Sequence, residues 1–131
     1  MKSWASIALV AAALSLGGCG AMRGMQEDFR SVVSGGRGEP ALATGIRQYE
    51  EGNYAAAAEN LNRALFEGLS SDGRVKAHKY LAFTHCVSNR PSACLVEFRR
   101  ALAINPNLEL SAAEAGHPIW GPVFRAVKST H

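Results

Sequence analysis

Two cysteines and two histidines stand close enough along the chain to suggest chemistry. Cys86 and Cys94 have seven residues between them, and His78 and His85 would share one face of a helix. Such a set could bind a metal ion, exchange electrons through a thiol pair, or form a structural disulfide. The cysteine spacing lacks the two-residue gap of zinc motifs and thioredoxin-like redox sites. No carboxylate is suitably placed beside the histidines, so we expect neither a metal site nor a cofactor.

The remaining polar residues form no catalytic pattern. His78 and His85 are interpreted as helix-packing or groove residues, and His117 as a side chain that holds the turn before Pro118. The sequence has no Ser-His-Asp arrangement and no paired carboxylates of the kind used in catalysis. The glycines at 35–38 lack the lysine and the helix that follow a phosphate-binding loop. We therefore expect no catalytic residue, no small-molecule substrate and no enzymatic activity.

The N-terminus carries the pattern of an export signal. Lys2 supplies a positive charge, and residues 7–14 form an apolar run too short to span a bilayer permanently. The segment ends in Leu16-Gly17-Gly18-Cys19, which resembles a bacterial lipobox. The resemblance implies cleavage before Cys19, attachment of diacylglycerol to its thiol and acylation of its amine. An ordinary secretory signal followed by a chance cysteine is the alternative.

Lipidation at Cys19 would decide the location of the chain. Each buried methylene contributes about 0.8 kcal/mol, so three acyl chains would make the attachment effectively permanent. Gly20 follows the cysteine, where an aspartate would resemble an inner-membrane retention signal. We expect a protein anchored in the outer membrane and facing the periplasm. The predicted organisation is a signal peptide over 1–18, a lipid-anchored tether over 19–40 and one domain over 41–131.

Export also bears on the cysteine pair and on possible partners. An even pair of cysteines in an oxidising compartment favours a Cys86–Cys94 disulfide, with a redox-active pair as the alternative. Without residues 1–18 the chain has 113 residues, and the loss of Lys2 lowers its formal charge from +3 to +2. Arg and Lys are scattered among Asp and Glu without a basic block. The sequence therefore predicts no nucleic-acid binding.

Apolar periodicity and turn residues predict a domain made only of helices. We expect helices over 41–51, 54–67, 74–87 and 91–104, and a closing helix over 118–128 that seals the apolar side of the 74–87 and 91–104 pair. Strand patterns are absent from the sequence. Trp120 in the closing helix is expected in the core, although stacking on a ligand is the alternative. The predicted fold class is all-α.

The segment before the domain allows two interpretations. Its apolar residues recur at three- and four-residue steps, which is the spacing of one helix face. They are Met22, Met25, Phe29, Val32 and Val33. The segment is either a short amphipathic helix that docks on a partner or on the domain, or a disordered tether. A disordered tether of about twenty residues would hold the domain roughly 25 Å from the membrane.

The two predicted helix pairs resemble each other and resemble tetratricopeptide repeats. The matching positions are Gly45, Gly52, Tyr54, Ala57, Leu61, Ala64 and Leu65 in the first pair, and Ala82, Asn89, Pro91, Cys94, Phe98, Ala101 and Leu102 in the second. The pairs are 37 residues apart, and the loop at 68–73 absorbs the excess over the usual repeat length. Small residues such as Gly45 and Cys94 would let paired helices approach closely. Two repeats need a cap, and the closing helix is expected to supply it.

Three segments carry a closer resemblance. They are residues 76–88 (KAHKYLAFTHCVS), 98–102 (FRRAL) and 113–124 (AEAGHPIWGPVF), together with Cys94. In combination they resemble the TssQ family of lipoproteins associated with type VI secretion systems. The resemblance covers roughly residues 42–128 and implies an accessory, non-catalytic envelope component.

The expected activity is therefore binding of another protein. The concave face of the repeats would hold a peptide or helix of an envelope or secretion protein. From repeat geometry, the residues expected to project from this face are Arg47, Glu50, Lys76, Lys79 and Tyr80. The alternative is a structural, scaffolding lipoprotein in outer-membrane or cell-wall assembly.

Overall fold

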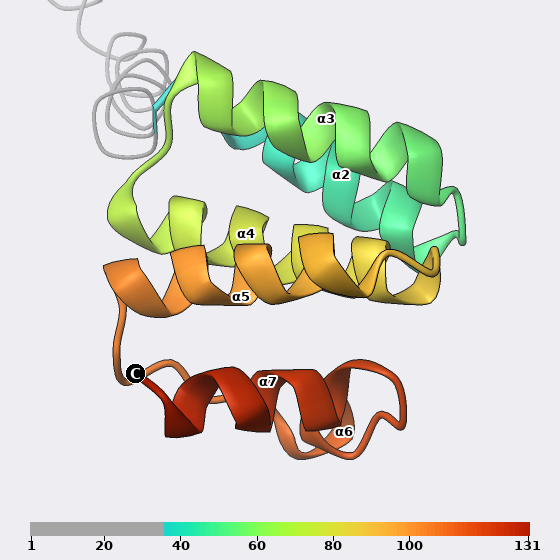
Figure 1. Ribbon diagram of the computed structural model, residues 1–131. Coiled ribbons are helices and arrows are strands. Elements are labelled where there is room, and N and C mark those ends of the chain that lie inside the picture. Colours follow the sequence, from blue (N-terminus) through green and yellow to red (C-terminus); the bar gives the residue numbers. More distant parts are fainter. Residues whose placement is uncertain (1–35) are drawn as a thin grey trace, which may run out of the picture.

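The computed structural model describes residues 36–131, which form six helices and no strand (Figure 1). In chain order these are α2 (Glu39–Glu50), α3 (Tyr54–Glu67), α4 (Ser71–Val87), α5 (Pro91–Ile104), α6 (Ala112–Ala115) and α7 (Trp120–Ser129). The predicted all-α class is confirmed. None of the described helices has the length and apolar character needed to cross a bilayer. The predictions for the signal peptide, for Cys19 and for the segment at 22–33 lie outside the described residues.

Two of the five predicted helices have the expected bounds, and three do not. Helices α3 and α5 have the predicted limits, and Pro91 opens α5 at a position where its missing N–H is harmless. Helix α4 begins three residues earlier than predicted, because the Ser70 hydroxyl accepts a hydrogen bond from the Gly73 N–H at 3.1 Å and caps it. Helix α2 begins at Glu39 and ends at Glu50, two residues and one residue earlier than predicted. Helix α7 begins two residues later than the predicted 118 and ends one residue later than the predicted 128.

The boundary predicted between tether and domain, at residue 41, therefore lies inside α2. The chain already packs on the domain before this helix starts. The Gly38 N–H donates to the Gly68 carbonyl at 2.9 Å, and Gly38 is buried. A Cβ on Gly38 would lie 2.1 Å from the Ala64 carbonyl oxygen, so only glycine fits there.

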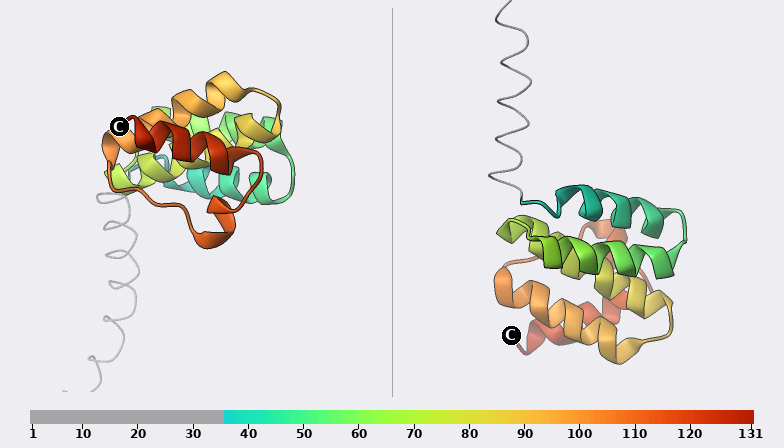
Figure 2. Two further views of the ribbon diagram at one scale, coloured as in Figure 1. Left: turned by 60° about the horizontal axis from the view of Figure 1, so that its bottom comes forward. Right: turned by 90° about the horizontal axis from the view of Figure 1, so that it is seen from above.

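The helices form two antiparallel hairpins and a closing layer. Figures 1 and 2 show α2 and α3 at one end of the stack, α4 and α5 in the middle, and α6 and α7 at the other end. Gly45 of α2 allows close approach within the first hairpin, since a Cβ there would lie 2.8 Å from Cγ of Leu61 in α3. The expected use of a small residue at this position is confirmed.

The closing layer consists of two helices where one was predicted. Ser111 and Glu114 form a capping box, and this box starts the short helix α6. Helix α7 then packs on α5 and α4, as expected of a cap. Trp120 is buried, so the prediction that it belongs to the core is confirmed. Its ring stacks on Phe83 of α4 with 4.5 Å between the ring centroids.

The predicted Cys86–Cys94 disulfide is present, with 2.07 Å between the two sulfur atoms. It joins the end of α4 to the first turn of α5. Both cysteines are buried in the core cluster that also contains Phe98 and Trp120. The disulfide therefore fixes the short turn of the second hairpin from the inside.

Candidate functional site

The five predicted binding residues all lie on α2 and α4, but the structure divides them into two groups. Arg47, Glu50 and Lys76 are exposed. Arg47 also forms an exposed ion pair with Glu51, one helical turn later, with 3.8 Å between Nε and Oε1. Lys79 and Tyr80 are half-buried and make contacts within the chain. We call these five residues and Tyr49 together the α2–α4 face, although Arg47 and Tyr49 project from different sides of α2, since side chains two positions apart on a helix do not face each other.

Tyr49 lies on the inward side of α2 and packs against the core cluster. Its ring centroid is 5.3 Å from that of Tyr80 and 6.0 Å from that of Phe83, both on α4. It is also 5.8 Å from the ring of Tyr54 and 6.4 Å from that of Trp120. Contacts at these separations are typical of favourable aromatic pairs. Tyr49 thus joins the first hairpin, the second hairpin and the closing layer.

Burial and neighbouring groups raise the pKa of Tyr49 and of Tyr80. Burial, followed by the neighbouring Tyr54, Tyr80 and Glu114, raises the pKa of Tyr49 to about 12. Burial and the carboxylates of Glu114 and Glu50 also raise the pKa of Tyr80. The α2–α4 face therefore offers neutral hydroxyl groups that can donate and accept hydrogen bonds beside apolar rings. This combination suits contacts with a peptide better than it suits nucleophilic chemistry.

Lys79 is engaged by the closing layer. Its Nζ donates to Oε1 of Glu114 in α6 at 2.8 Å, which connects two positions that are 35 residues apart. The same Nζ lies 5.3 Å from the centroid of the Tyr80 ring. Partial burial alone would raise the pKa of Glu114, but hydrogen bonds from Lys79 and Ser111 outweigh it and lower the pKa. The ammonium group of Lys79 thus has an internal role.

The turn after α6 holds the closing layer in place. Nδ1 of His117 accepts a hydrogen bond from the Ile119 N–H at 3.2 Å, as expected of a side chain that holds this turn. The His117 ring stacks on Trp120 with 3.3 Å between centroids. The indole N–H of Trp120 donates to the Glu114 carbonyl at 2.9 Å. These contacts fix Glu114 opposite Lys79.

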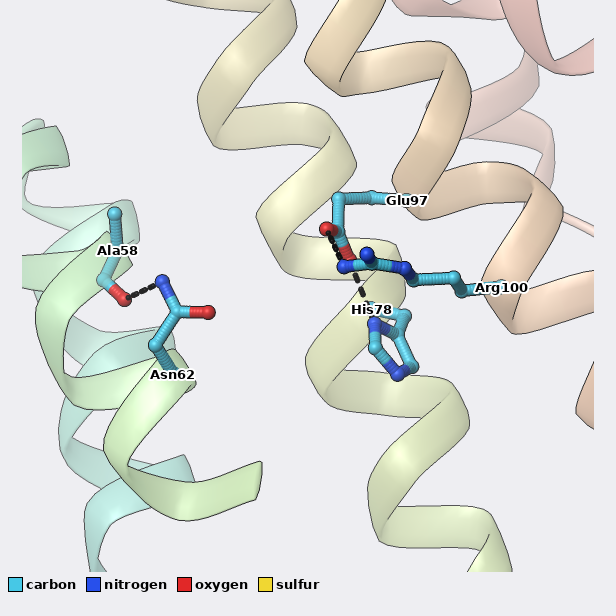
Figure 3. A network of polar contacts seen from close by, with 5 residues as sticks. All are labelled: Ala58, Asn62, His78, Glu97 and Arg100. Carbon is cyan, nitrogen blue, oxygen red and sulfur yellow. Dashed lines mark hydrogen bonds and ion pairs between the residues drawn. The ribbon is translucent and has the colours of Figure 1, made fainter. Parts of the chain in front are cut away.

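A buried carboxylate joins α4 to α5 away from this face (Figure 3). Glu97 is 6% exposed, and its Oε2 lies 2.6 Å from Nδ1 of His78. Its other oxygen, Oε1, accepts from Arg100 at 2.7 Å. The separate bond in the same view, from Asn62 to the Ala58 carbonyl at 2.9 Å, lies within α3 alone. Glu97 therefore places a polar network inside the second hairpin.

This network carries no catalytic arrangement. Among the hydrogen bonds of residues 36–131, none joins His78 to a hydroxyl or a thiol. In the same range, no three side chains of the metal-binding types gather in one place. His85 takes no part in the hydrogen bond between His78 and Glu97. Burial is the main cause that lowers the pKa of His85; the charge of Glu97 opposes this shift and the charge of Arg90 adds to it. His78 thus packs between α4 and α5, which is one of the two roles predicted for it, whereas the prediction that no carboxylate stands beside the histidines was wrong, because Glu97 of the next helix contacts His78.

Sequence reasoning missed Tyr49 and Glu97, although both carry a signal. Tyr49 continues the inward stripe that begins at Leu42 and Gly45, in steps of three and four residues. Glu97 stands on the inward side of α5, three residues after Cys94. A carboxylate at such a position predicts a buried partner, because a charge is rarely buried unpaired.

A second surface feature lies elsewhere on the molecule. A hollow of about 550 Å³ opens between α5 and α7, and Val96, Arg99 and Val127 contribute to its wall. None of the predicted binding residues lines it. The α2–α4 face and this hollow are thus separate.

Comparison with known proteins finds no matching family model, no matching curated protein and no matching solved structure. The resemblance to tetratricopeptide repeats and to the TssQ family therefore stays a prediction carried by the residues of the sequence.

Proposed function

We propose that this chain is a non-catalytic outer-membrane lipoprotein that presents a helical-repeat binding module to the periplasm. Its role would be that of an accessory component of a type VI secretion system. The N-terminal signal pattern and Cys19 support the anchor. The Cys86–Cys94 disulfide agrees with an oxidising compartment.

The α2–α4 face is the observation that carries the binding proposal. It combines half-exposed tyrosine rings with the exposed charges of Arg47, Glu50 and Lys76. Tyrosine and arginine are enriched where proteins bind other proteins. The partner would be a peptide or helix of an envelope or secretion protein. Its apolar side chains would pack on the tyrosine rings, and its charged groups would lie opposite Arg47, Glu50 and Lys76.

Capture of the partner from cells with an active secretion system tests this proposal. Chemical crosslinking in intact membranes, followed by purification of the lipidated protein, should recover membrane-complex or baseplate proteins of the secretion machine. Recovery of outer-membrane assembly or peptidoglycan factors alone would instead support the alternative, a structural lipoprotein in cell-wall assembly.

Two matched arginine variants test the position of the binding face. Arg47 and Arg63 form equivalent exposed ion pairs, 3.8 Å from Glu51 and 3.7 Å from Glu67. Arg47→Ala should weaken capture, because charges at a rim steer association, whereas Arg63→Ala on α3 should not. Equal capture by both variants would contradict the assignment of the α2–α4 face, and it would leave the lipid anchor untouched.

A further inference from the structure

The hollow between α5 and α7 combines apolar side chains with arginines. Its lining residues on α5 recur in steps of three and four positions, so they form one stripe along the helix; they are Val96, Arg99, Arg100 and Ala103. Val127 lines the hollow from α7. None of the described residues that line it is acidic. The hollow therefore suits a ligand that brings an apolar side chain together with negative charge.

The two arginines of the hollow are available to a carboxylate. Arg99 is exposed and forms no ion pair with another residue of the range 36–131. Arg100 donates from Nη1 to Oε1 of Glu97, but its side chain is still 59% exposed. A guanidinium group has several N–H donors, so the bond to Glu97 leaves others for a ligand.

Helix α3 presents the chemistry that this hollow would accept. Phe66 is 92% exposed, whereas the other phenylalanines of residues 36–131 are buried. It lies on the side of α3 opposite the buried Ala64, so its ring points away from the core of its own chain. Glu59 is on the same exposed stripe, and Glu67 directly follows the ring. The charged residues of α3 are these two glutamates and Arg63, which leaves the helix with a net negative charge.

Phe66 and the hollow lie on different parts of one molecule. Figure 1 shows α3 in the hairpin at one end of the stack and α7, which forms one wall of the hollow, at the other end. Phe66 is not among the residues that line the hollow. The ring of one copy can therefore reach only the hollow of another copy.

We propose that copies of this chain associate head to tail, with Phe66 of one copy in the hollow between α5 and α7 of the next. An apolar cavity of about 150 Å³ holds a benzene ring, so a hollow of about 550 Å³ has room for the phenyl group. The ring would pack on Val96 and Val127. The glutamates of α3 would lie opposite the arginines of the hollow, where carboxylates and guanidinium groups form strong hydrogen bonds.

The exposed large apolar side chains of residues 36–131 favour a second copy over an unrelated partner. They are Phe66, Val96 and Ile119. Phe66 is the inserted ring, and Val96 lines the hollow. Ile119 stands eight residues before Val127, which is two turns along the same side of α7. One contact between copies would thus cover all three side chains, whereas an unrelated partner in the hollow would leave Phe66 in water.

A contact of this kind does not end at a dimer. Because the inserted ring and the hollow are different surfaces, each docked copy still presents one of them, and association continues into a ring or an open row. None of the residues of the α2–α4 face takes part. The inference therefore depends neither on the proposed partner of that face nor on the lipid anchor.

Mixing two variants tests the head-to-tail contact. The full chain, purified in detergent, is followed by sedimentation velocity over a range of protein concentrations, and the native chain should form species larger than dimers. Phe66→Ala should weaken association by about thirtyfold or more, as expected of a buried aromatic anchor. Arg99→Glu should also weaken it, because it places like charges opposite each other. Both positions are exposed, so both variants should fold.

An equimolar mixture of these two variants should form dimers and nothing larger. The intact ring of the Arg99→Glu chain can enter the intact hollow of the Phe66→Ala chain, and the resulting dimer has no second working pair of surfaces. The matched control is Arg90→Glu, which reverses the charge of an exposed arginine outside the hollow and should associate like the native chain.

Photo-crosslinking in cells gives a second readout. Phe66→p-benzoyl-phenylalanine in the full chain should crosslink to α5 or α7 of a second copy, as mapped by mass spectrometry. Adducts with lipid or with another protein alone would overturn the proposal. A native chain that stays monomeric, equal association of the native chain and Phe66→Ala, or a mixture that does not dimerise would also overturn it. Self-association without capture of a secretion protein would refute only the proposed function.

Discussion

Replacing Glu97 tests whether the polar network between α4 and α5 holds the second hairpin together. Glu97→Ala removes a carboxylate that is almost wholly buried and that bonds to His78 at 2.6 Å and to Arg100 at 2.7 Å. The two partners respond differently. The His78 side chain is 13% exposed and would lose its partner in a largely buried place, whereas Arg100 is 59% exposed and would return to water.

The expected size of the effect follows from these exposures. A hydrogen bond to a charged group contributes about 1.5–3 kcal/mol, and an exposed ion pair contributes about 0–1 kcal/mol. Truncation also leaves a small cavity in place of the Cγ methylene and the carboxyl group. We expect Glu97→Ala to lower the free energy of unfolding by about 2–4 kcal/mol. Glu97→Gln keeps the volume and one hydrogen bond, so its loss should be roughly half as large.

Urea denaturation of the oxidised protein, followed by circular dichroism, measures these differences. Arg100→Ala is the matched control, because it removes only the exposed partner and should cost at most about 1 kcal/mol. In thermal unfolding, a domain of this size shifts by about 4–8 °C for each kcal/mol. A double-mutant cycle between Glu97→Gln and His78→Ala isolates the coupling of the buried pair.

One outcome would refute this reasoning. If Glu97→Ala cost no more than Arg100→Ala, the bond to His78 would contribute nothing measurable. The second hairpin would then depend on the disulfide and the apolar core alone.

Three further predictions concern the disulfide, a tyrosine and a glycine. Reduction of the Cys86–Cys94 bond, or Cys86→Ser, should lower stability by about 2–3 kcal/mol for so short a loop; an unchanged melting temperature and thiol count would contradict this. Spectrophotometric titration should show one tyrosine ionising near pH 12, absent in Tyr49→Phe. Because the folded pKa is raised, stability should fall as the pH rises from about 10 to 12. Gly45→Ala should cost about 1–3 kcal/mol in urea denaturation, since its Cβ meets Leu61 at 2.8 Å.

Local sequence signals predicted most of the fold because they act over a few residues. The apolar stripes of α3 and α5, the turn at Gly52 and the proline at the start of α5 are all readable within one helix length. The disulfide was predictable because eight positions separate its cysteines, and this distance closes across a single turn. The capping box of α6 was likewise readable from its four-residue spacing.

The contacts that were missed depend on tertiary structure. The early start of α2 rests on the close approach of Gly38 to Gly68, which are 30 residues apart in the sequence. The Lys79–Glu114 ion pair joins residues 35 positions apart. The sequence around Lys79 and the sequence around Glu114 contain no periodic pattern that predicts an ion pair between the two residues. Repeat geometry places Lys79 on the correct helix, but it cannot show that α6 turns back to contact that helix.

The Lys79–Glu114 ion pair changes how the α2–α4 face should be understood. Lys79 holds the closing layer against α4, whereas Tyr80 packs on Tyr49 of α2, so replacing either residue would disturb the fold as well as any bound partner. Arg47, Glu50 and Lys76 are exposed and form no hydrogen bond or ion pair with the closing layer in the described residues, so they are available for binding without contributing to the cap. For the proposed binding, most of the energy is therefore expected from the Tyr49 and Tyr80 rings, which the fold already holds in place. Specificity is expected from the exposed charged side chains. Such a division suits a rigid module, because preformed aromatic contacts lose little conformational entropy when a peptide binds.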